Sequence, residues 1–183
     1  MSLRFAILTA LTERDATGLE LSRRFDRSIG HFWPASHQQI YRELDRLAAD
    51  GLVTAEPVPG RGQPKRYAIA APGSEALRAW MGDSEPLSTR REALYVKLRA
   101  AAALGDPEAV RAPVEHHLAL HEANLASYRE IEARDFSPAP DGRAVLQHRV
   151  LQAGIELEVT LAQWCRDTLV ELDRLSAEVG ASR

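Results

Sequence analysis

The 183-residue chain has a single cysteine, Cys165, and few aromatic residues, which make up 6% of the sequence. One cysteine excludes an intrachain disulfide framework and a thiolate-rich zinc site, and it fits a reducing compartment. Because Trp164 beside it belongs to an apolar helix face, Cys165 is expected to be a small buried apolar residue and not a redox sensor. We therefore expect a cytoplasmic protein.

Long apolar runs are also missing from the chain. No stretch of 18 residues is free of charge, and residues 1–25 contain no apolar run followed by a small-residue cleavage site. The sequence thus predicts neither an exported nor a membrane-spanning protein. Its apolar content of 45% is sufficient for a hydrophobic core.

Motifs for catalysis and metal binding are absent as well. The chain has no G-x-S-x-G, H-E-x-x-H or paired-cysteine motif, and residues 60–65 lack the spacing of a phosphate loop. His117 and His121 form an i, i+4 pair next to His116, but no full set of metal ligands accompanies them. We therefore predict no enzyme, no metal site and no cofactor.

The charge is unevenly distributed. The chain has a net charge of −3, but residues 1–83 carry 11 Lys and Arg against 10 Asp and Glu, whereas residues 84–183 carry 12 against 16. Binding to nucleic acid requires only a local basic patch that faces the phosphates. The charge balance therefore permits DNA binding by the first part without demonstrating it.

Apolar periodicity and capping residues predict a defined order of elements in residues 1–83. The predicted elements are helices over 3–11, 17–29 and 37–50, strands over 52–58 and 66–69, and a closing helix over 74–81. Three helices, a two-stranded hairpin and a helix form the element order of a winged helix-turn-helix. The fold is predicted to be mostly α-helical.

Residues 82–86 are the predicted linker, and the chain beyond them is predicted to form three helices. The last of these runs from about Arg143 to Val179. We place the domain boundary after Asp83, with a DNA-binding domain over 1–83 and a helical domain over 84–183.

One narrow seam of the last predicted helix is expected to form a dimer interface, because only two other helices share its domain and much apolar surface would stay exposed in a monomer. The seam consists of Leu157, Leu161, Trp164, Thr168, Leu172, Leu175 and Val179. We therefore expect a homodimer.

The third predicted helix carries side chains suited to the major groove. Gln can bind adenine, Arg can bind guanine, and a helix N-terminus offers free N–H groups to phosphate. The candidate DNA contacts on this helix are Ser36, His37, Gln38, Gln39, Tyr41, Arg42 and Arg46, and Thr17 is added at the start of the second helix. A solvated polar face would explain one such helix alone, but the surrounding order of elements favours a DNA-binding function.

The hairpin tip is basic and rich in glycine. Arg61, Gly62, Lys65 and Arg66 are the candidate wing contacts to phosphates or the minor groove. The alternative function is a protein-interaction adaptor that keeps the winged fold and binds another protein through its acidic helical half.

The large aromatic residues of the second part are Tyr95, Tyr128 and Trp164. Together they could line a pocket for a flat effector, although core packing explains each of them singly.

Residues 3–81 resemble the PadR family of bacterial transcriptional regulators. The residues that carry the resemblance are Ile7-Leu8, Thr17-Gly18-Leu19-Glu20-Leu21, Phe32-Trp33, Ile40-Tyr41, Leu44, Leu47, Gly51-Leu52-Val53, Arg66-Tyr67 and Gly73. The second part resembles the helical domain of the Vir-type subfamily through Lys97-Leu98 and Gly105-Asp106-Pro107-Glu108. The resemblance implies a homodimer held by C-terminal helices, repression at a palindromic DNA operator, and release by a small aromatic or drug-like effector.

The chain departs from the family pattern at two places. Leu19 stands where the family usually has Tyr, which could alter the packing of the second helix or a contact of its backbone. Residues 70–72 read Ala-Ala-Pro where the family has a Thr-rich helix start, so Pro72 is the only start signal of the closing helix.

Overall fold

The computed structural model describes residues 3–27, 35–60, 62–84, 92–136 and 142–181. Its contacts divide the chain into two compact units, residues 1–88 and 89–183. Each unit has its own cluster of buried apolar side chains.

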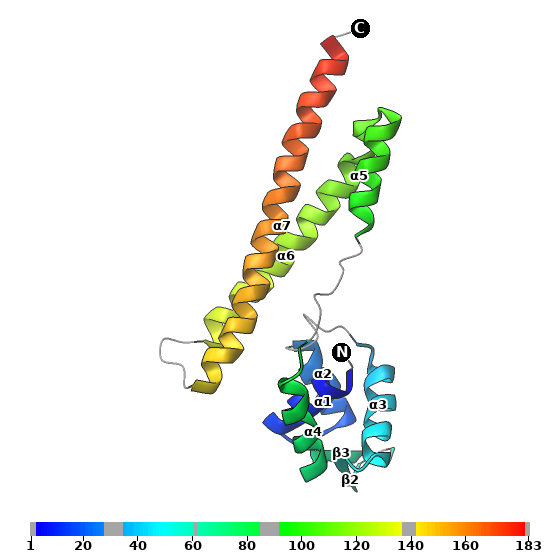
Figure 1. Cartoon of the computed structure of the whole chain (residues 1–183), viewed down its shortest axis with the longest axis vertical. Coiled ribbons are helices and arrows are strands. Elements are labelled where there is room, and N and C mark those ends of the chain that lie inside the picture. The colour runs from blue at the N-terminus through cyan, green and yellow to red at the C-terminus, as the bar shows by residue number, and fades with distance from the viewer. Residues whose placement is uncertain (1–2, 28–34, 61, 85–91, 137–141, 182–183) are drawn as a thin grey trace. The chain divides into compact units, whose positions relative to one another are not determined.

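The first unit has the predicted winged helix-turn-helix order of elements (Figure 1). In chain order its elements are α1 (Leu3–Glu13), β1 (Ala16–Thr17), α2 (Gly18–Arg27), α3 (His37–Ala49), β2 (Val53–Pro57), β3 (Lys65–Ile69) and α4 (Ala71–Met81). Strand β1 is an element that was not predicted from the sequence. This strand pairs antiparallel with β3, with Ala16 opposite Tyr67, so the sheet has the order β1-β3-β2.

Three helices of the first unit meet in a fully enclosed core. Its central members, contributed by α1, α2 and α3, are at most 1% exposed and comprise Ile7, Leu8, Leu11, Leu21, Phe25, Ile40, Leu44 and Leu47. The rings of Phe5 and Trp80 stack with centroids 4.7 Å apart and join α1 to α4 at the edge of this core. The core therefore determines which face of each helix is exposed and available for binding.

Helix α4 begins at Ala71, three residues before the predicted start at Ser74. Pro72 occupies its first turn, where a missing N–H group costs no intrahelical hydrogen bond. Gly73 then lies against the turn that joins α3 to β2, since a Cβ atom added there would stand 2.1 Å from the carbonyl oxygen of Leu52. The backbone N–H of Ala70 donates to the same oxygen at 3.0 Å.

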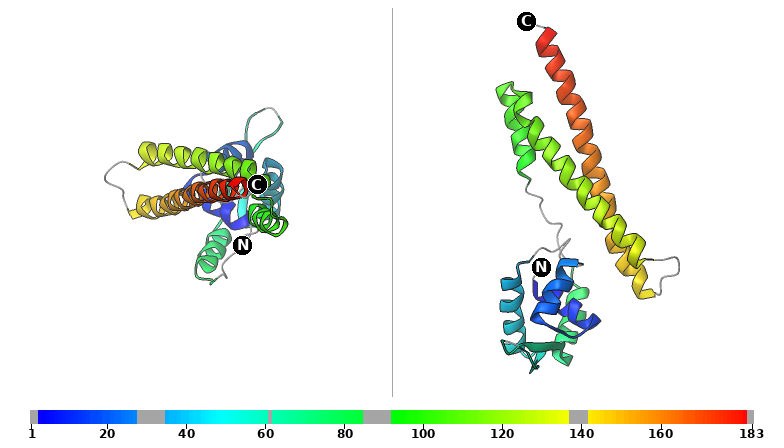
Figure 2. Two further views of the ribbon diagram at one scale, coloured as in Figure 1. Left: turned by 90° about the horizontal axis from the view of Figure 1, so that it is seen from above. Right: turned by 180° about the vertical axis from the view of Figure 1, so that it is seen from behind.

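The second unit is the predicted three-helix assembly with a long last helix (Figure 2). It consists of α5 (Ala93–Leu104), the short 3₁₀ helix η2 (Pro107–Val110), α6 (Arg111–Asp135) and α7 (Gly142–Ala181). Helices α6 and α7 run side by side in opposite directions in all views (Figures 1 and 2). No helix in the described part of the chain is long and apolar enough to span a membrane.

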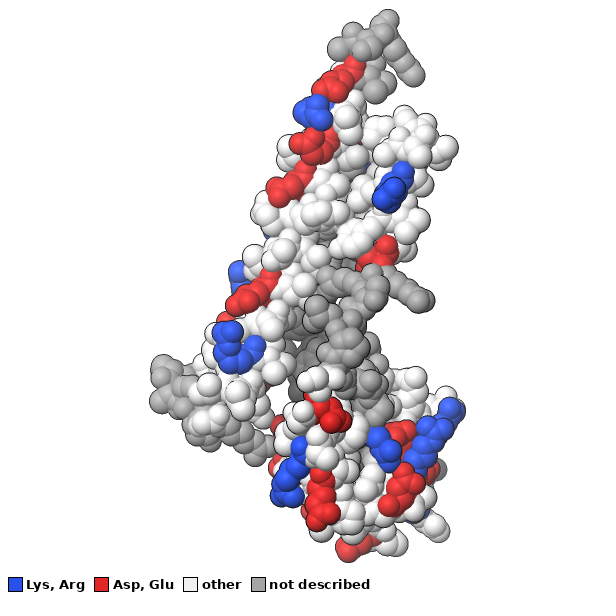
Figure 3. Space-filling view, in the orientation of Figure 1, with Lys and Arg blue, Asp and Glu red and all other residues white. Residues whose placement is uncertain are grey.

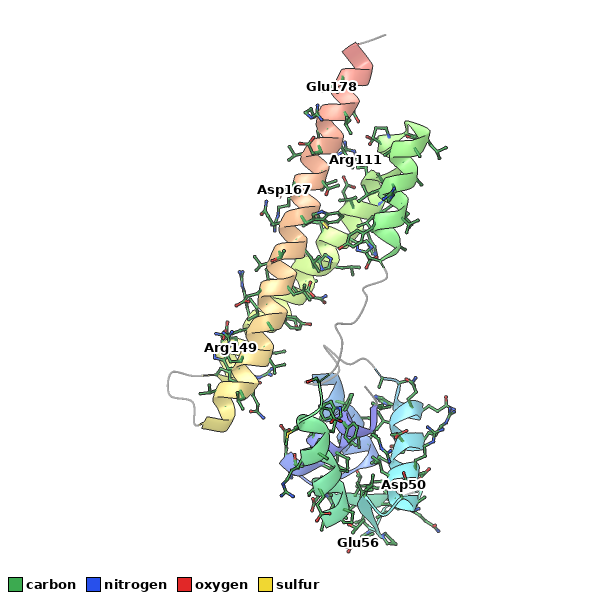
Figure 4. The ribbon with its side chains drawn as sticks, viewed as in Figure 1. Asp50, Glu56, Arg111, Arg149, Asp167 and Glu178 are labelled. Carbon is green, nitrogen blue, oxygen red and sulfur yellow. The ribbon has the colours of Figure 1, made fainter. Side chains whose placement is uncertain are left out.

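Apolar and polar contacts both tie the second unit together. Cys165 is 1% exposed, and burial raises the pKa of its thiol, which agrees with a packing role. Arg111 lies between the start of α6 and α7 (Figure 4), where its guanidinium contacts Asp173 at 2.8 Å. Further along the pair of helices, His148 of α7 bonds Glu132 of α6 at 2.6 Å.

The contact at Gly73 gives a test of the fold of the first unit. We expect Gly73→Ala to destabilise the protein by roughly 1–3 kcal/mol, because the added methyl group would overlap the Leu52 carbonyl. Gly82→Ala, at the other end of the same helix, is the matched control, since a Cβ atom there meets nothing closer than 3.5 Å. Urea unfolding at one protein concentration measures both changes, and equal losses would contradict the close approach at Gly73.

Candidate nucleic-acid interface

A capping box fixes the N-terminus of α3. Ser36 adopts an extended conformation, and its Oγ accepts a hydrogen bond from the backbone N–H of Gln39 at 3.3 Å. The side-chain Oε1 of Gln39 accepts in return from the backbone N–H of Ser36 at 2.8 Å. The first turn of α3 therefore starts at a defined residue.

The side of α3 that faces away from the core carries the predicted DNA contacts. Ile40, Leu44 and Leu47 are fully buried on the inner side. All seven predicted positions on this helix are exposed, namely Ser36, His37, Gln38, Gln39, Tyr41, Arg42 and Arg46. The structure thus brings them to one surface, with the buried side chains as an anchor.

The capping box changes the interpretation of Gln39. A bidentate contact to adenine uses both the oxygen and the nitrogen of the side-chain amide. The oxygen of Gln39 already holds the backbone of Ser36, so Gln38 and Arg42 are better placed to contact base edges. The Ser-x-x-Gln spacing of residues 36–39 is the sequence signal for this reciprocal box.

Tyr41 links α3 to the beginning of α2. A Cβ atom on Gly18 would stand 2.2 Å from Cε1 of Tyr41, so only glycine allows this approach. Tyr41 is 42% exposed and therefore both packs on α2 and reaches the outer surface. Leu19, the first departure from the family pattern, is exposed and leaves the buried face of α2 unchanged.

A second capping box joins the start of α2 to the sheet. The backbone N–H of Thr17 donates to Oε2 of Glu20 at 2.8 Å, and the N–H of Glu20 donates to the hydroxyl of Thr17 at 3.3 Å. These hydrogen bonds lower the pKa of Glu20, and the charges of Arg66 and Arg14 lower it further. Thr17 is also the strand partner of Arg66, so the start of α2 lies beside the wing.

The wing is a hairpin closed by a hydrogen bond from the N–H of Val58 to the carbonyl oxygen of Pro64 at 2.9 Å. Gly62 and Lys65 are exposed, and Gly62 has a φ of 87° that favours glycine. Arg66 is partly exposed and lies 3.5 Å from Glu20. The predicted contact Arg61 lies outside the described residues.

Basic and acidic side chains alternate on the face of the first unit seen in Figure 3. Arg46 pairs with Glu43 of its own helix at 3.2 Å. Arg42 and Lys65, by contrast, form no ion pair with any other described residue. Among the described candidate DNA contacts, these two cations are thus the ones most directly available to a phosphate or a base.

The structure brings together two of the three aromatic residues that were predicted to line a pocket. Tyr95 and Trp164 meet edge to face with ring centroids 5.3 Å apart, beside a small hollow in the second unit. Tyr128 does not line this hollow. It is 9% exposed and packs on α7, where a Cβ atom on Gly154 would be 3.1 Å from its ring.

The predicted dimer seam is divided between the inside and the outside of the chain. Leu172 belongs to the buried cluster, Trp164 packs against it, and Leu161 and Thr168 are partly covered. Leu157 and Leu175 remain exposed, whereas the side chain of Val179 lies outside the described part. The middle of the seam therefore packs in the chain's own core.

Within the described residues, no group of three or more His, Cys, Asp or Glu could hold a metal ion.

Comparison with known proteins gives matches over both units. Residues 7–79 match the model of the transcriptional regulator PadR-like family, and residues 90–173 match that of the virulence activator alpha C-terminal domain. A Mycobacterium tuberculosis protein named a probable transcriptional regulator is 41% identical, in a match that covers 90% of this chain and 94% of the relative.

Solved structures match nearly the whole chain. The virulence activator AphA of Vibrio cholerae matches with a TM-score of 0.78 and 32% identity, over 95% of this chain and 99% of that one. PadR of Bacillus subtilis in complex with operator DNA matches with a TM-score of 0.79 and 25% identity, over 92% and 97%. The same B. subtilis protein has been solved with p-coumaric acid, and that structure matches at 24% identity with a TM-score of 0.77, over 93% and 98%. This chain belongs to the PadR-like family of transcriptional regulators, and the prediction that it is not an enzyme agrees with that family.

Proposed function

We propose that this regulator is a homodimeric repressor that occupies a palindromic DNA operator and leaves it when a small effector binds. The observation that carries this proposal is the polar, exposed side of α3, held in place by a fully buried apolar side and by a capping box. The B. subtilis relative solved with operator DNA supports a DNA partner of this kind.

The geometry suggests a division of roles among the DNA contacts. Gln38 and Arg42 contact base edges, because their side chains project from α3 without a role in its cap. Thr17 and Ser36 lie at helix N-termini, where free N–H groups favour phosphate. The wing residues Gly62 and Lys65, together with Arg61 and Arg66, contribute contacts to the backbone or the minor groove.

The dimer contact is proposed for an apolar stripe on α7. Leu146, Val150, Leu157 and Leu175 are 71%, 51%, 41% and 36% exposed. Their separations of 4, 7 and 18 residues are each close to a whole number of turns of about 3.6 residues, so they share one face. Covering this face in a dimer would remove from water the apolar surface that a monomer leaves open.

The effector is proposed to bind in the helical unit near Tyr95 and Trp164. The support for this location is the hollow beside these rings. The B. subtilis relative solved with p-coumaric acid supports a small-molecule partner in general, and neither its place nor its charge is carried over. Such a ligand can release DNA only if it binds the DNA-free state more tightly than the bound one.

Titration against random duplexes and against the DNA upstream of its own gene tests the DNA-binding function. We expect enrichment of a palindrome with half-sites ~10 base pairs apart. If about six phosphates are neutralised per dimer, affinity should fall on the order of 10³-fold between about 50 and 200 mM salt. No enriched duplex and a flat salt dependence would reject the repressor and favour the protein-interaction adaptor.

Substitution of Arg42 tests the recognition surface. Arg42→Ala should weaken binding to the preferred operator by roughly 1–3 kcal/mol and relax the preference at one base position. Arg78→Ala on α4 removes the same charge from an exposed site outside the proposed interface and is the matched control. Selection from random duplexes with both variants gives the readout, and an unchanged preference in the Arg42 variant would contradict its assignment.

A charge placed in the apolar stripe tests the dimer. We expect Leu157→Glu to weaken dimerisation, because a carboxylate in an apolar interface has no partner to replace its hydration. Val170→Glu is the control, since Val170 is 64% exposed on the opposite face of α7. Sedimentation equilibrium measures both dissociation constants, and a dimer as tight in the Leu157 variant as in the control would show that the interface lies elsewhere.

A further inference from the structure

The hollow in the second unit is bounded by rings on several sides. It has a volume of about 90 Å³ and is lined by Glu92, Leu94, Tyr95, His117, His121, Leu161 and Trp164. These residues come from α5, its N-cap, α6 and α7. All of them belong to the same compact unit.

The size of the hollow limits what can enter it. A water molecule needs roughly 10–15 Å³ of such space, so there is room for a compact group of several heavy atoms. Pockets that enclose a drug-sized ligand have volumes of about 300–1,000 Å³. The hollow therefore fits the head group of a ligand, while the rest of that ligand would lie outside.

The rings around the hollow present faces in different directions. Tyr95 and Trp164 have an interplanar angle of 80°, and the rings of His117 and His121 are 6.1 Å apart with an angle of 51°. The faces of Tyr and Trp carry negative electrostatic potential and attract cations, most strongly quaternary ammonium groups enclosed by several rings.

The charges around the hollow favour the same kind of ligand. Glu92 is a carboxylate, and none of the described residues that line the hollow is Lys or Arg. Oε1 of Glu92 accepts a hydrogen bond from the N–H of Leu94 at 3.4 Å, which holds the carboxylate at the start of α5. Among the described residues that line the hollow, an anionic head group would therefore meet the Glu92 carboxylate and no Lys or Arg.

The buried carboxyl group of Glu158 contacts His121, one of the residues that line the hollow. Nδ1 of His121 contacts Oε2 of Glu158 at 2.6 Å, and Asn124 donates to Oε1 of Glu158 at 3.4 Å. Glu158 is only 8% exposed. Glu158 thus places a second carboxyl group in contact with a residue that lines the hollow.

We propose that this hollow binds the ammonium head group of a small organic cation, with Tyr95 and Trp164 as aromatic walls and Glu92 as the counter-charge. Binding of the cation does not depend on the proposed function. Only the identification of this cation as the effector that releases DNA rests on it. The site itself follows from the size, ring arrangement and charge of the hollow.

Calorimetric titration of the full chain, without DNA, tests the site. The probes are choline chloride and 3,3-dimethyl-1-butanol, which replaces the ammonium nitrogen by carbon and has nearly the same shape. We expect saturable choline binding that is about tenfold tighter than binding of the alcohol, as cation–π and carboxylate contacts predict. Equal affinities, or no saturable choline binding, would overturn the proposal.

Two variants and one control identify the residues. Glu92→Gln keeps an oxygen for the Leu94 N–H and should weaken choline binding by about tenfold without changing binding of the alcohol. Tyr95→Leu removes one wall and should weaken choline binding as well. Glu115→Gln changes an exposed carboxylate of α6 that does not line the hollow, and it should bind choline like the unmodified chain. Equal weakening in the Glu92 and Glu115 variants would overturn the site assignment, and thermal melts verify that each variant is folded.

A separate DNA-binding assay distinguishes this site from the proposed function. Choline that binds but leaves operator affinity unchanged would overturn the effector role and support the head-group site. A chain that fails to bind any operator would overturn the repressor function, and the calorimetric result would stand unaffected.

Discussion

Burial of one side of α3 is the constraint on which the DNA-binding unit depends. Ile40, Leu44 and Leu47 are completely enclosed among residues of α1 and α2, and each buried side chain of this size contributes roughly 1.5–3 kcal/mol. A helix anchored in this way cannot rotate about its axis without exposing these side chains. Gln38 and Arg42 are consequently held outward by the core and not by any contact of their own.

The same type of capping box then sets where the two helices of the motif begin. Thr17 with Glu20 and Ser36 with Gln39 follow one spacing, and each pair satisfies two backbone N–H groups. This use of side chains has a functional consequence, because an oxygen that caps a helix is no longer free for a base. The polar residues at the start of α3 are therefore needed both for capping the helix and for the proposed contacts to DNA.

Much of this arrangement could be predicted from the sequence, because it follows from local patterns. The apolar periodicity and the capping residues gave the helices of both units, and the glycine-rich stretch gave the hairpin. Strand β1 was missed because two residues cannot show alternation. The start of α4 was predicted too late because the residue before it, Ala70, has no side-chain cap that would mark a helix start in the sequence. The grouping of Tyr95 with Trp164, but not with Tyr128, depends on contacts between helices far apart in sequence, for which the chain offers no local signal.

The apolar seam of α7 could be identified from the sequence, but the sequence did not show which of its residues pack in the chain's own core and which remain for a second copy of the chain. An α-helix that packs along one side has residues at the border of that side which are neither buried nor free. Thr168 occupies this border, between buried Cys165 and Leu172 on one side and exposed Leu157 and Leu175 on the other, whereas Trp164 is partly buried on the same face as Leu157. Because Trp164 also lines the hollow, a ligand bound there would contact the same helix that carries the apolar stripe. The hollow and the stripe would then be coupled through one continuous rigid element, and the sign of that coupling would depend on which arrangement of the dimer the ligand binds more tightly.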